Sequence, residues 1–418
     1  MKRILLLSTA LTAGALWPAA AAEPQAVVST YADIALATYE DSLSTAQTLR
    51  EAIDTLVAAP SEETLGAARQ AWLAARVPYQ QSEAFRFGNA IVDEWEGRVN
   101  AWPLDEGLID YVDAGYGTES DTNEFYTVNV IANDKLSVGG TEIDASAITP
   151  EVIQSLHEVG GIEANVATGY HAIEFLLWGQ DLNGTDAGAG ARPASDFDPA
   201  NCTGDHCERR IQYLTAASDL LIADLEEMVA NWQTDGEARA EVTGDAKAGL
   251  TAMLTGLGSL SYGELAGERM KLGLLLNDPE EEHDCFSDNT HNSHYYDLVG
   301  IRNVYFGSYK RVDGSTVEGP SLADLVGEKD AALAEEVKGK LDATLAAMTA
   351  LKARAEGGEA YDQMIGQGNE AGNAVVQAAI DGLVDQTRSL ERAIVALDLS
   401  GIELEGSDSL DNPDAVFE

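Results

Sequence analysis

Apolar residues recur at helical spacing near the start of the chain. They return every three or four positions over residues 27–56 and again over residues 65–79, a pattern typical of helices that bury one face. Pro60 and Ser61 separate the two runs, and Ser61 is a suitable N-cap. The pattern predicts two successive amphipathic helices.

The same spacing returns in the second half of the chain. It predicts helices over residues 209–232, 246–276, 322–356 and 371–397. Thr149 followed by Pro150 is typical of a helix start, with the cap residue before proline at the first helical position. That start predicts a short helix, and a second one after Gly160-Gly161. The periodicity therefore indicates an all-α fold.

Two stretches lack the helical pattern. Between residues 115 and 149, Gly, Asn, Asp and Thr collect, and only residues 126–131 look like a strand. This stretch is expected to be a long irregular connection with a small hairpin. Residues 184–205 are rich in Gly, Ala, Asp and Pro and are expected to form a loop.

A weak internal duplication bears on the domain organisation. Residues 79–86 (YQQSEAFR) are similar to residues 262–269 (YGELAGER). Such a duplication suits two helical bundles packed side by side. We expect an N-terminal bundle over residues 23–190 and a C-terminal bundle over residues 191–400. An acidic, aperiodic tail over residues 401–418 is expected to be frayed.

The first residues resemble an export signal. Lys2 and Arg3 precede a mainly apolar run that ends at Trp17, and Ala20-Ala21-Ala22 offers a cleavage site. This order is typical of a secretory signal peptide over residues 1–22. The run is shorter than the roughly 20 residues of a membrane span. We therefore expect a periplasmic or outer-membrane-associated protein with no transmembrane segment.

Charge narrows the range of partners. The chain has 25 basic and 71 acidic residues, a formal net charge of −46. A surface of this kind repels nucleic acid and anionic lipid and attracts cations loosely. Nucleic acid is therefore excluded as a partner, but the charge does not identify a site.

Three cysteines allow one intramolecular disulfide. Cys202 and Cys207 lie close together in a loop-like segment, and an oxidising compartment permits a local bridge between them. Cys285 could instead pair with either of them. One cysteine is left over in any such pairing.

The sharpest local feature is a histidine and a glutamate one helical turn apart. His171 and Glu174 share one helix face, and the residues from Ile173 to Trp178 are mainly apolar, so the helix is expected to be buried. An imidazole and a carboxylate on one face form half of a divalent metal site. The alternative is an ordinary hydrogen-bonded pair inside a core.

A second cluster spans residues 280–294. It holds three of the six histidines, His283, His291 and His294, among several acidic residues. Oxygen and nitrogen donors at these spacings could bind a divalent or ferric ion. The alternative is a polar loop whose Ser, Asp and Asn side chains cap helices.

Together these segments resemble a known family. Residues 169–181 (GYHAIEFLLWGQD) resemble the G-x-H-x-x-E signature of imelysin-like proteins. Residues 72–88 (WLAARVPYQQSEAFRFG) are similar to that family's first conserved helix. Residues 263–270 (GELAGERM) and 281–291 (EEHDCFSDNTH) are similar to its C-terminal segments, especially in the branch called iron-regulated protein A. The resemblance extends from about residue 25 to residue 397.

The resemblance implies two four-helix bundles with a polar site near their interface. Gly169, His171 and Glu174 match the signature. The other residues that fall in matching segments are Glu83, Arg86, Glu282, Ser287 and Asp288. The predicted metal ligands are His171, Glu174 and Glu83.

Three functions remain open on this basis. The first is an exported protein that binds a divalent or ferric ion, with iron favoured and zinc an option, or an iron-containing small ligand. It would act in iron acquisition, with an outer-membrane or uptake-system partner. The second is a zinc metallopeptidase, whose third ligand would come from Glu83 or the His283 region. The chain lacks the H-E-x-x-H motif of helical zinc peptidases. The third is a purely structural polar network.

Overall fold

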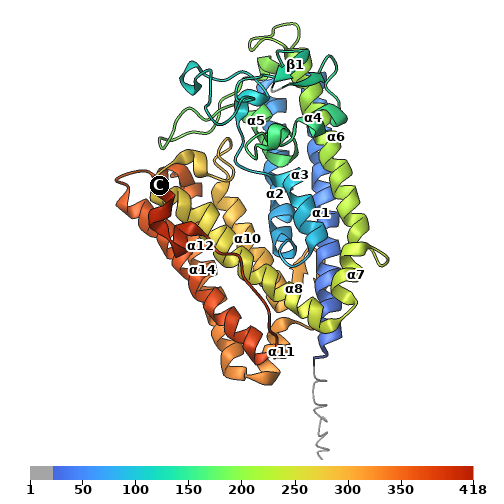
Figure 1. Ribbon diagram of the computed structural model, residues 1–418, viewed down its shortest axis with the longest axis vertical. Helices are drawn as coiled ribbons and strands as arrows, with labels where there is room; N and C mark the ends of the chain where they lie inside the picture. Colours follow the sequence, from blue (N-terminus) through green and yellow to red (C-terminus); the bar gives the residue numbers. More distant parts are fainter. Residues whose placement is uncertain (1–21, 139, 418) are drawn as a thin grey trace, which may run out of the picture.

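The computed structural model describes residues 22–138 and 140–417 and is mostly helical (Figure 1). The prediction of a mainly helical fold is confirmed. The expected signal peptide lies outside the described residues, apart from Ala22. The α-helices are α1 (Pro24–Ala58), α2 (Glu62–Ser82), α3 (Ala90–Asn100), α4 (Pro150–Leu156), α5 (Gly169–Trp178), α6 (Cys207–Trp232), α7 (Glu237–Thr243), α8 (Ala246–Ser259), α9 (Leu272–Leu276), α10 (Thr290–Phe306), α11 (Leu322–Lys329), α12 (Ala331–Glu356), α13 (Tyr361–Ile365), α14 (Glu370–Ala396) and α15 (Asp408–Asp411).

Shorter elements connect these helices. The strands are β1 (Lys135–Val138), β2 (Thr141–Asp144), β3 (Ser308–Lys310) and β4 (Thr316–Glu318). The 3₁₀ turns are η1 (Glu83–Phe85), η2 (Glu106–Leu108), η3 (Ala114–Tyr116), η4 (Val159–Gly161), η5 (Ala194–Phe197), η7 (Pro279–Glu281) and η8 (Pro413–Phe417). The segment η6 (Leu260–Lys271) is a π-helix that joins α8 to α9.

Side-chain caps start several helices where the sequence predicts them. The Ser61 hydroxyl accepts a hydrogen bond from the Thr64 N–H at 3.2 Å, and Thr149 caps α4. The predicted single helix over residues 322–356 is wrong, because the chain breaks at Asp330. The Asp330 carboxylate accepts hydrogen bonds from Ala332 and Leu333 and thereby begins α12.

The long helices pack in two groups that meet along α2. Helix α1 lies against α2 and α6, whereas α12 lies against α10 and α14 (Figure 1). Helix α10 packs on both α2 and α12 and so links the two groups. Helix α6 packs along α1, although the expected boundary after residue 190 assigns α6 to the C-terminal bundle. The division into two four-helix bundles stays a prediction.

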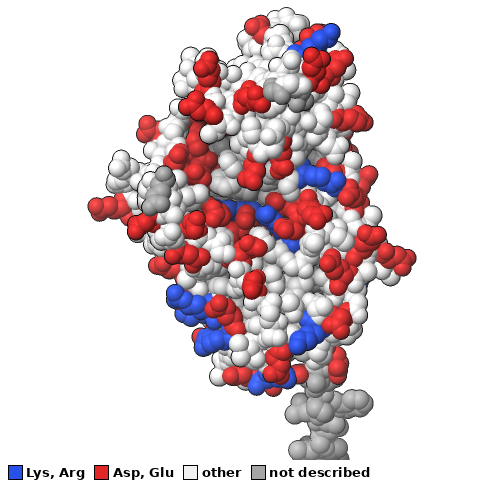
Figure 2. Space-filling view, viewed as in Figure 1, with Lys and Arg blue, Asp and Glu red and all other residues white. Residues whose placement is uncertain are grey.

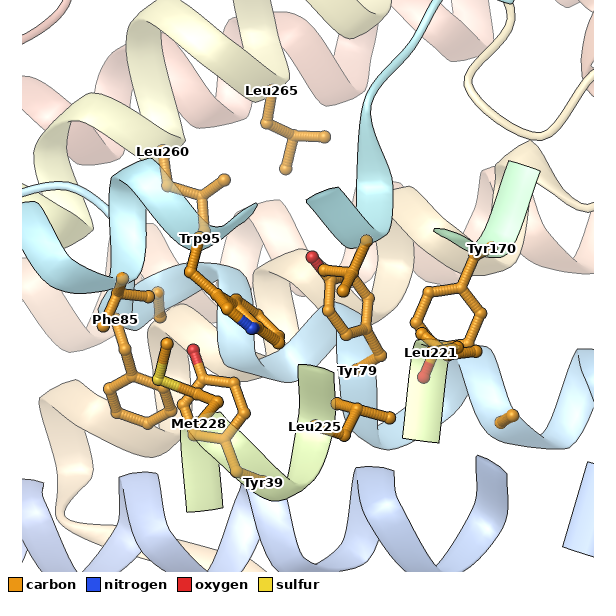
Figure 3. Packing of buried hydrophobic residues seen from close by; sticks show 14 of the residues in the cluster. Tyr39, Tyr79, Phe85, Trp95, Tyr170, Leu221, Leu225, Met228, Leu260 and Leu265 are labelled. Carbon is orange, nitrogen blue, oxygen red and sulfur yellow. The ribbon is translucent and has the colours of Figure 1, made fainter. Parts of the chain in front are cut away.

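An aromatic core fills the space between α1, α2, α3 and α6. The rings of Tyr39 and Trp95 meet edge to face at 5.7 Å, and those of Tyr79 and Tyr170 lie 4.7 Å apart (Figure 3). Tyr170 is the second residue of the buried helix α5, so this core extends directly to the segment that carries His171.

The small hairpin forms at a different place from the predicted strand. Residues 126–131 form turns, and the hairpin is β1 paired antiparallel with β2, with Leu136 opposite Ile143. Val130 and Ile131 are buried in these turns, which accounts for the apolar run. Their backbone N–H groups donate to the carbonyls of Leu108 and Ile109. Strands β3 and β4 form a second hairpin that the sequence did not predict.

Helix α10 also escaped prediction. Its buried face carries Thr290, Ser293, His294 and Asp297 as well as apolar residues. Because polar side chains occupy buried positions, the apolar spacing that marks the other helices is absent. The polar cluster at residues 280–294 is therefore partly the start of a helix and not only a loop.

The expectation of a frayed C-terminal tail is wrong. The tail lies against the end of α8 and against η6. The Glu405 N–H donates to the Ser259 hydroxyl at 3.0 Å, and the Ser409 hydroxyl donates to the Gly267 carbonyl at 2.9 Å. Small residues on η6 permit this approach. Elsewhere, Cys202 and Cys207 form a disulfide, and Cys285 is a free thiol.

Acidic side chains are spread across the face of the molecule seen in Figure 2. Basic side chains on this face are fewer and gather mainly in a central band and toward the lower end. Within the described residues, every helix is too short or too polar to span a bilayer.

Candidate functional site

Helix α5 is held tightly against the end of α3. Gly169 has a φ of +78°, and a Cβ at this position would lie 2.3 Å from the Val99 carbonyl oxygen. Only glycine fits both the backbone conformation and the close approach. The Trp72 indole N–H donates to the Tyr170 carbonyl at 2.9 Å. These contacts fix the position from which the next side chain, His171, projects.

His171 and Glu174 form a buried pair on α5. The His171 Nδ1 lies 3.0 Å from the Glu174 Oε2, and the two side chains are 1% and 0% exposed. The other Glu174 oxygen accepts hydrogen bonds from the Ser287 N–H at 3.0 Å and the Ser287 hydroxyl at 2.6 Å. Both predicted residues thus share one inward-facing site with Ser287.

Burial controls the protonation of this pair. It raises the pKa of Glu174 well above its usual value, and the nearby Asp284 carboxylate adds to the effect. Burial lowers the pKa of His171 to about 3, assisted by the positive charge of Arg76. His171 is therefore neutral at physiological pH, which is the form of imidazole that binds metals.

Two further donors come from the segment between η7 and α10. The rings of His171 and His283 lie 4.8 Å apart at an angle of 75°. His171, His283 and Asp284 each offer a ligand atom, and these three atoms lie within 4.8 Å of one another. All three residues are buried. The site therefore combines two imidazoles and one carboxylate from two distant parts of the chain.

Arg76 on α2 holds the Asp284 carboxylate in its charged form. The guanidinium donates to the Asp284 Oδ1 at 2.8 Å, and Asn289 and Ser293 donate to Oδ2. Burial alone would raise the pKa of Asp284, but Arg76 and these hydrogen bonds outweigh it and hold the pKa below its usual value. Asp284 thus offers a charged carboxylate oxygen inside the protein, which is a suitable metal ligand.

Two nitrogen atoms at the site lack partners. Among the described residues, neither the Nε2 of His171 nor the Nδ1 of His283 has a hydrogen-bond partner. Buried polar atoms of this kind are uncommon and call for a ligand, ion or water. Two unpartnered imidazole nitrogens beside an ionised carboxylate fit a divalent transition metal.

A cavity of about 540 Å³ gives access to this site. His171 and His283 line this cavity together with Trp102 and Phe286. Its remaining walls are mainly acidic and aromatic, formed among others by Asp105, Glu106, Tyr116, Tyr126, Glu280 and Glu281. A cation could reach the two imidazoles through this cavity, and a small ligand could occupy it.

Glu83 and Arg86 lie in a neighbouring ion-pair network. Arg269 donates to Glu83 at 2.7 Å, and Arg86 lies 3.5 Å from Glu264. The two similar segments, residues 79–86 and 262–269, therefore contact each other. Arg269 of the second lies beside Glu83 of the first, and Arg86 of the first lies beside Glu264 of the second. Asp297 also contacts Arg269, at 3.2 Å. The structure places Glu83 in this network and outside the His171 group.

The remaining predicted residues have different surroundings. Ser287 binds Glu174, as described above. Glu282 accepts a hydrogen bond from the Thr290 hydroxyl at 2.8 Å through Oε2. Asp288 has a φ of +54° and lies in a second carboxylate group with Asp181 and Asp362. Glu282 and Asp288 therefore do not belong to the group that contains His171.

Sequence reasoning missed Arg76, and it placed Asp284 only in the polar cluster at residues 280–294, apart from His171. Arg76 is 1% exposed and its guanidinium carbon lies 5.1 Å from the centre of the Tyr170 ring. A signal was present, because Arg76 lies one helical turn from both Trp72 and Tyr79 on the buried face of its helix. A charged residue at such a position needs a buried partner.

Comparison with known proteins defines the class to which this fold and site belong. The sequence profile of imelysin matches residues 35–390, which is most of the chain. The protein therefore belongs to the imelysin family. The resemblance found in the G-x-H-x-x-E segment is confirmed.

Individual relatives connect the chain to proteins named for iron regulation. A stretch of 85 residues is 38% identical to iron-regulated protein A of Synechococcus elongatus, and it spans 20% of this chain and 22% of that protein. The chain thus matches less than a quarter of the length of this curated relative.

Two crystal structures share the fold. A candidate iron-regulated protein A precursor from Parabacteroides distasonis superposes with a TM-score of 0.65 at 19% identity, over 91% of this chain and 97% of that chain. An imelysin-like protein from Psychrobacter arcticum superposes with a TM-score of 0.60 at 17% identity, over 91% of this chain and 98% of that one.

Proposed function

We propose that this protein is an exported, metal-binding member of the imelysin family that acts in iron acquisition. One observation carries the proposal: the ligand atoms of His171, His283 and Asp284 converge within 4.8 Å of one another in a buried site. We infer export from the signal-like residues 1–22, and export would bring the protein to the periplasm or the outer membrane. Delivery of iron would require an uptake-system partner.

The donor set favours iron among the common metals. Two histidines and one carboxylate on one side of an ion, with open positions opposite, are typical of non-haem Fe(II) sites. Zinc accepts the same donors and is the alternative ion. The relative named iron-regulated protein A supports the choice of iron, since its name links that protein to regulation by iron.

Glu174 is assigned a positioning role in this site. Its Oε2 lies at the Nδ1 of His171, so the Nδ1 proton can be donated to the carboxylate while Nε2 keeps a free lone pair. A carboxylate behind a metal-binding histidine fixes the tautomer and the ring orientation. In this account Glu174 acts through His171 and Ser287 holds Glu174.

The acidic cavity suits delivery of a cation to the site. Asp105, Glu106, Glu280 and Glu281 lie on its walls, and a pocket of one charge sign raises the local concentration of oppositely charged ions. Its volume of about 540 Å³ also leaves room for an iron-containing small ligand. The same walls disfavour ligands that carry a large negative charge.

Calorimetry on chelator-treated protein tests the proposal. We expect one ion per chain to bind in titrations with anaerobic Fe(II) and with Zn(II), and His283→Ala to weaken binding at least 100-fold. The exposed Asp121→Asn serves as the control and should bind like the wild type. Absence of uptake by the wild type, or equal uptake by the His283 variant, would reject the proposal.

A zinc metallopeptidase is the second candidate. The observation that favours it is the combination of three grouped donors with a cavity at the imidazoles, because a catalytic zinc has three protein ligands and an open position for water. Cleavage of an unfolded protein substrate that is lost with a chelator and restored by zinc would support this candidate. Lack of cleavage across several substrates and metals would count against it.

A further inference from the structure

A second group of carboxylates lies apart from the histidines. Asp181 follows α5, Asp288 precedes α10, and Asp362 belongs to α13. One oxygen from each lies within 4.8 Å of the others. Three segments that are far apart in the sequence therefore bring three negative groups to one point.

Several oxygens of this group are buried and lack partners. Asp362 is 2% exposed, and within the described chain neither of its carboxylate oxygens makes a hydrogen bond. The backbone N–H groups of Gln363 and Asp362 lie close enough to lower its pKa, although neither forms a hydrogen bond by distance and angle. The Oδ1 of Asp288 is also buried and unpartnered. These atoms are acceptors without donors.

A fourth carboxylate faces the same place. Glu282 is 1% exposed and its Oε1 has no hydrogen-bond partner among the described residues. A small cavity of about 10 Å³ lies between Asp181, Glu282 and Asp362. This is about the space that one water molecule or one ion occupies.

Positive charge is missing from this group. Over residues 22–138 and 140–417, no lysine, arginine or histidine forms an ion pair with any of the four carboxylates. Burial raises the pKa of Asp362 to about 6 and that of Asp288 to about 7, and the neighbouring carboxylates add to both shifts. Three acids at one point, with Glu282 beside them and no counter-ion, are costly unless a cation binds.

We propose that Asp181, Asp288 and Asp362, with Glu282 beside them, bind a calcium ion. Donors that are all oxygen select hard cations, in contrast to the two imidazoles of the His171 site. Calcium accepts several protein carboxylates at about 2.4 Å, so two oxygens on opposite sides of the ion lie about 4.8 Å apart. Magnesium keeps most of its water and takes only one or two carboxylates.

This ion would connect the segments that build the His171 site. Asp181 lies just beyond the end of α5, and Asp288 follows Ser287, which binds Glu174. Calcium would hold the segment before α10 against α5 and against α13 at the same time. The calcium site is a separate site, so its existence does not depend on iron binding.

Thermal unfolding with and without calcium tests this inference. In 150 mM NaCl, calcium at about 100 times its Kd should raise the Tm of the wild type by about 3–5 °C relative to excess chelator. Asp362→Asn should lose this rise, whereas Asp121→Asn, which changes the charge equally at an exposed position, should keep it. His283→Ala should also keep the rise, because it leaves the carboxylates intact.

The Asp362→Asn variant is informative because it should still fold. Asp362→Asn removes a buried charge, so in chelator its Tm should equal or exceed that of the wild type. Asp288→Asn provides a second variant with the same expected loss of the calcium effect. An equal calcium-dependent rise in wild type and both variants, or no rise in the wild type, would overturn the inference. A rise of the same size with magnesium would contradict the choice of calcium.

Discussion

Glu174→Gln is the sharpest perturbation of the His171 site. The substitution keeps the shape of the side chain but turns one carboxylate oxygen into an NH₂ group. The Ser287 N–H is an obligatory donor to the Glu174 Oε1, so the glutamine oxygen must take that position. Its NH₂ group then faces the Nδ1 of His171 and donates to it. This forces the imidazole proton onto Nε2, the nitrogen proposed to bind the metal.

The size of the effect follows from the loss of the binding tautomer. Outer carboxylates behind metal-bound histidines contribute about 10–100-fold to affinity, which is about 1.4–2.8 kcal/mol. In the metal-free protein, burial favours the protonated form of Glu174, which a glutamine resembles, so the free energy of unfolding should change by no more than about 1 kcal/mol. Metal binding would release that proton and restore the carboxylate behind His171, which glutamine cannot do. We therefore expect weaker metal binding at nearly unchanged Tm.

The assay compares Kd and Tm for the wild type, Glu174→Gln and Glu83→Gln. Glu83 is equally buried but pairs with Arg269, so its variant should lose stability and keep its metal affinity. That contrast also tests the sequence-based prediction that Glu83 is a ligand. Equal metal affinity in Glu174→Gln and wild type would refute the tautomer argument. A large loss of Tm without a change in affinity would identify a purely structural network.

Three further outcomes are expected. Arg76→Leu should lower the free energy of unfolding by about 3–5 kcal/mol in urea, because it leaves Asp284 charged, buried and unpaired; a loss below about 1 kcal/mol would show that the pair is not needed. Gly169→Ala should destabilise by more than about 2 kcal/mol, since its Cβ would meet the Val99 carbonyl at 2.3 Å, and an unchanged Tm would contradict this packing. His294 is buried with its pKa lowered to about 3, against about 6.5 when unfolded. The stability that it contributes as a neutral group is present above pH 6.5 and is lost as pH falls toward 3, so between pH 6.5 and 4.5 the wild type should lose up to about 3 kcal/mol relative to His294→Gln. If the Tm of the wild type and of His294→Gln changed in parallel with pH, the lowered pKa of His294 would be contradicted.

The sequence predicted the parts of the fold that rest on local chemistry. Apolar spacing located α1, α2, α6 and α14, and the cap residue Ser61 located the start of α2. Helix α10 was missed because its buried face is polar, with His294 and Asp297 at positions that apolar residues usually take. The strand predicted at residues 126–131 was wrong because those apolar residues are buried in turns.

Half of the candidate site was visible in the sequence. His171 and Glu174 are one turn apart on a helix, so their proximity follows from helical geometry alone. His283 and Asp284 join them only through the packing of the segment before α10 on α5, more than 100 residues later. Spacing along the chain carries no information about that contact. The pairing of Arg76 with Asp284 depends on the same tertiary contact.

Anomalous X-ray diffraction from crystals of iron-loaded protein would locate the metal independently of any affinity measurement. We expect one iron peak per chain, within bonding distance of His171 and His283 and beside Asp284. Data from crystals of His283→Ala treated identically should lack that peak. Iron located elsewhere on the acidic surface, with both imidazoles free of metal, would contradict the account.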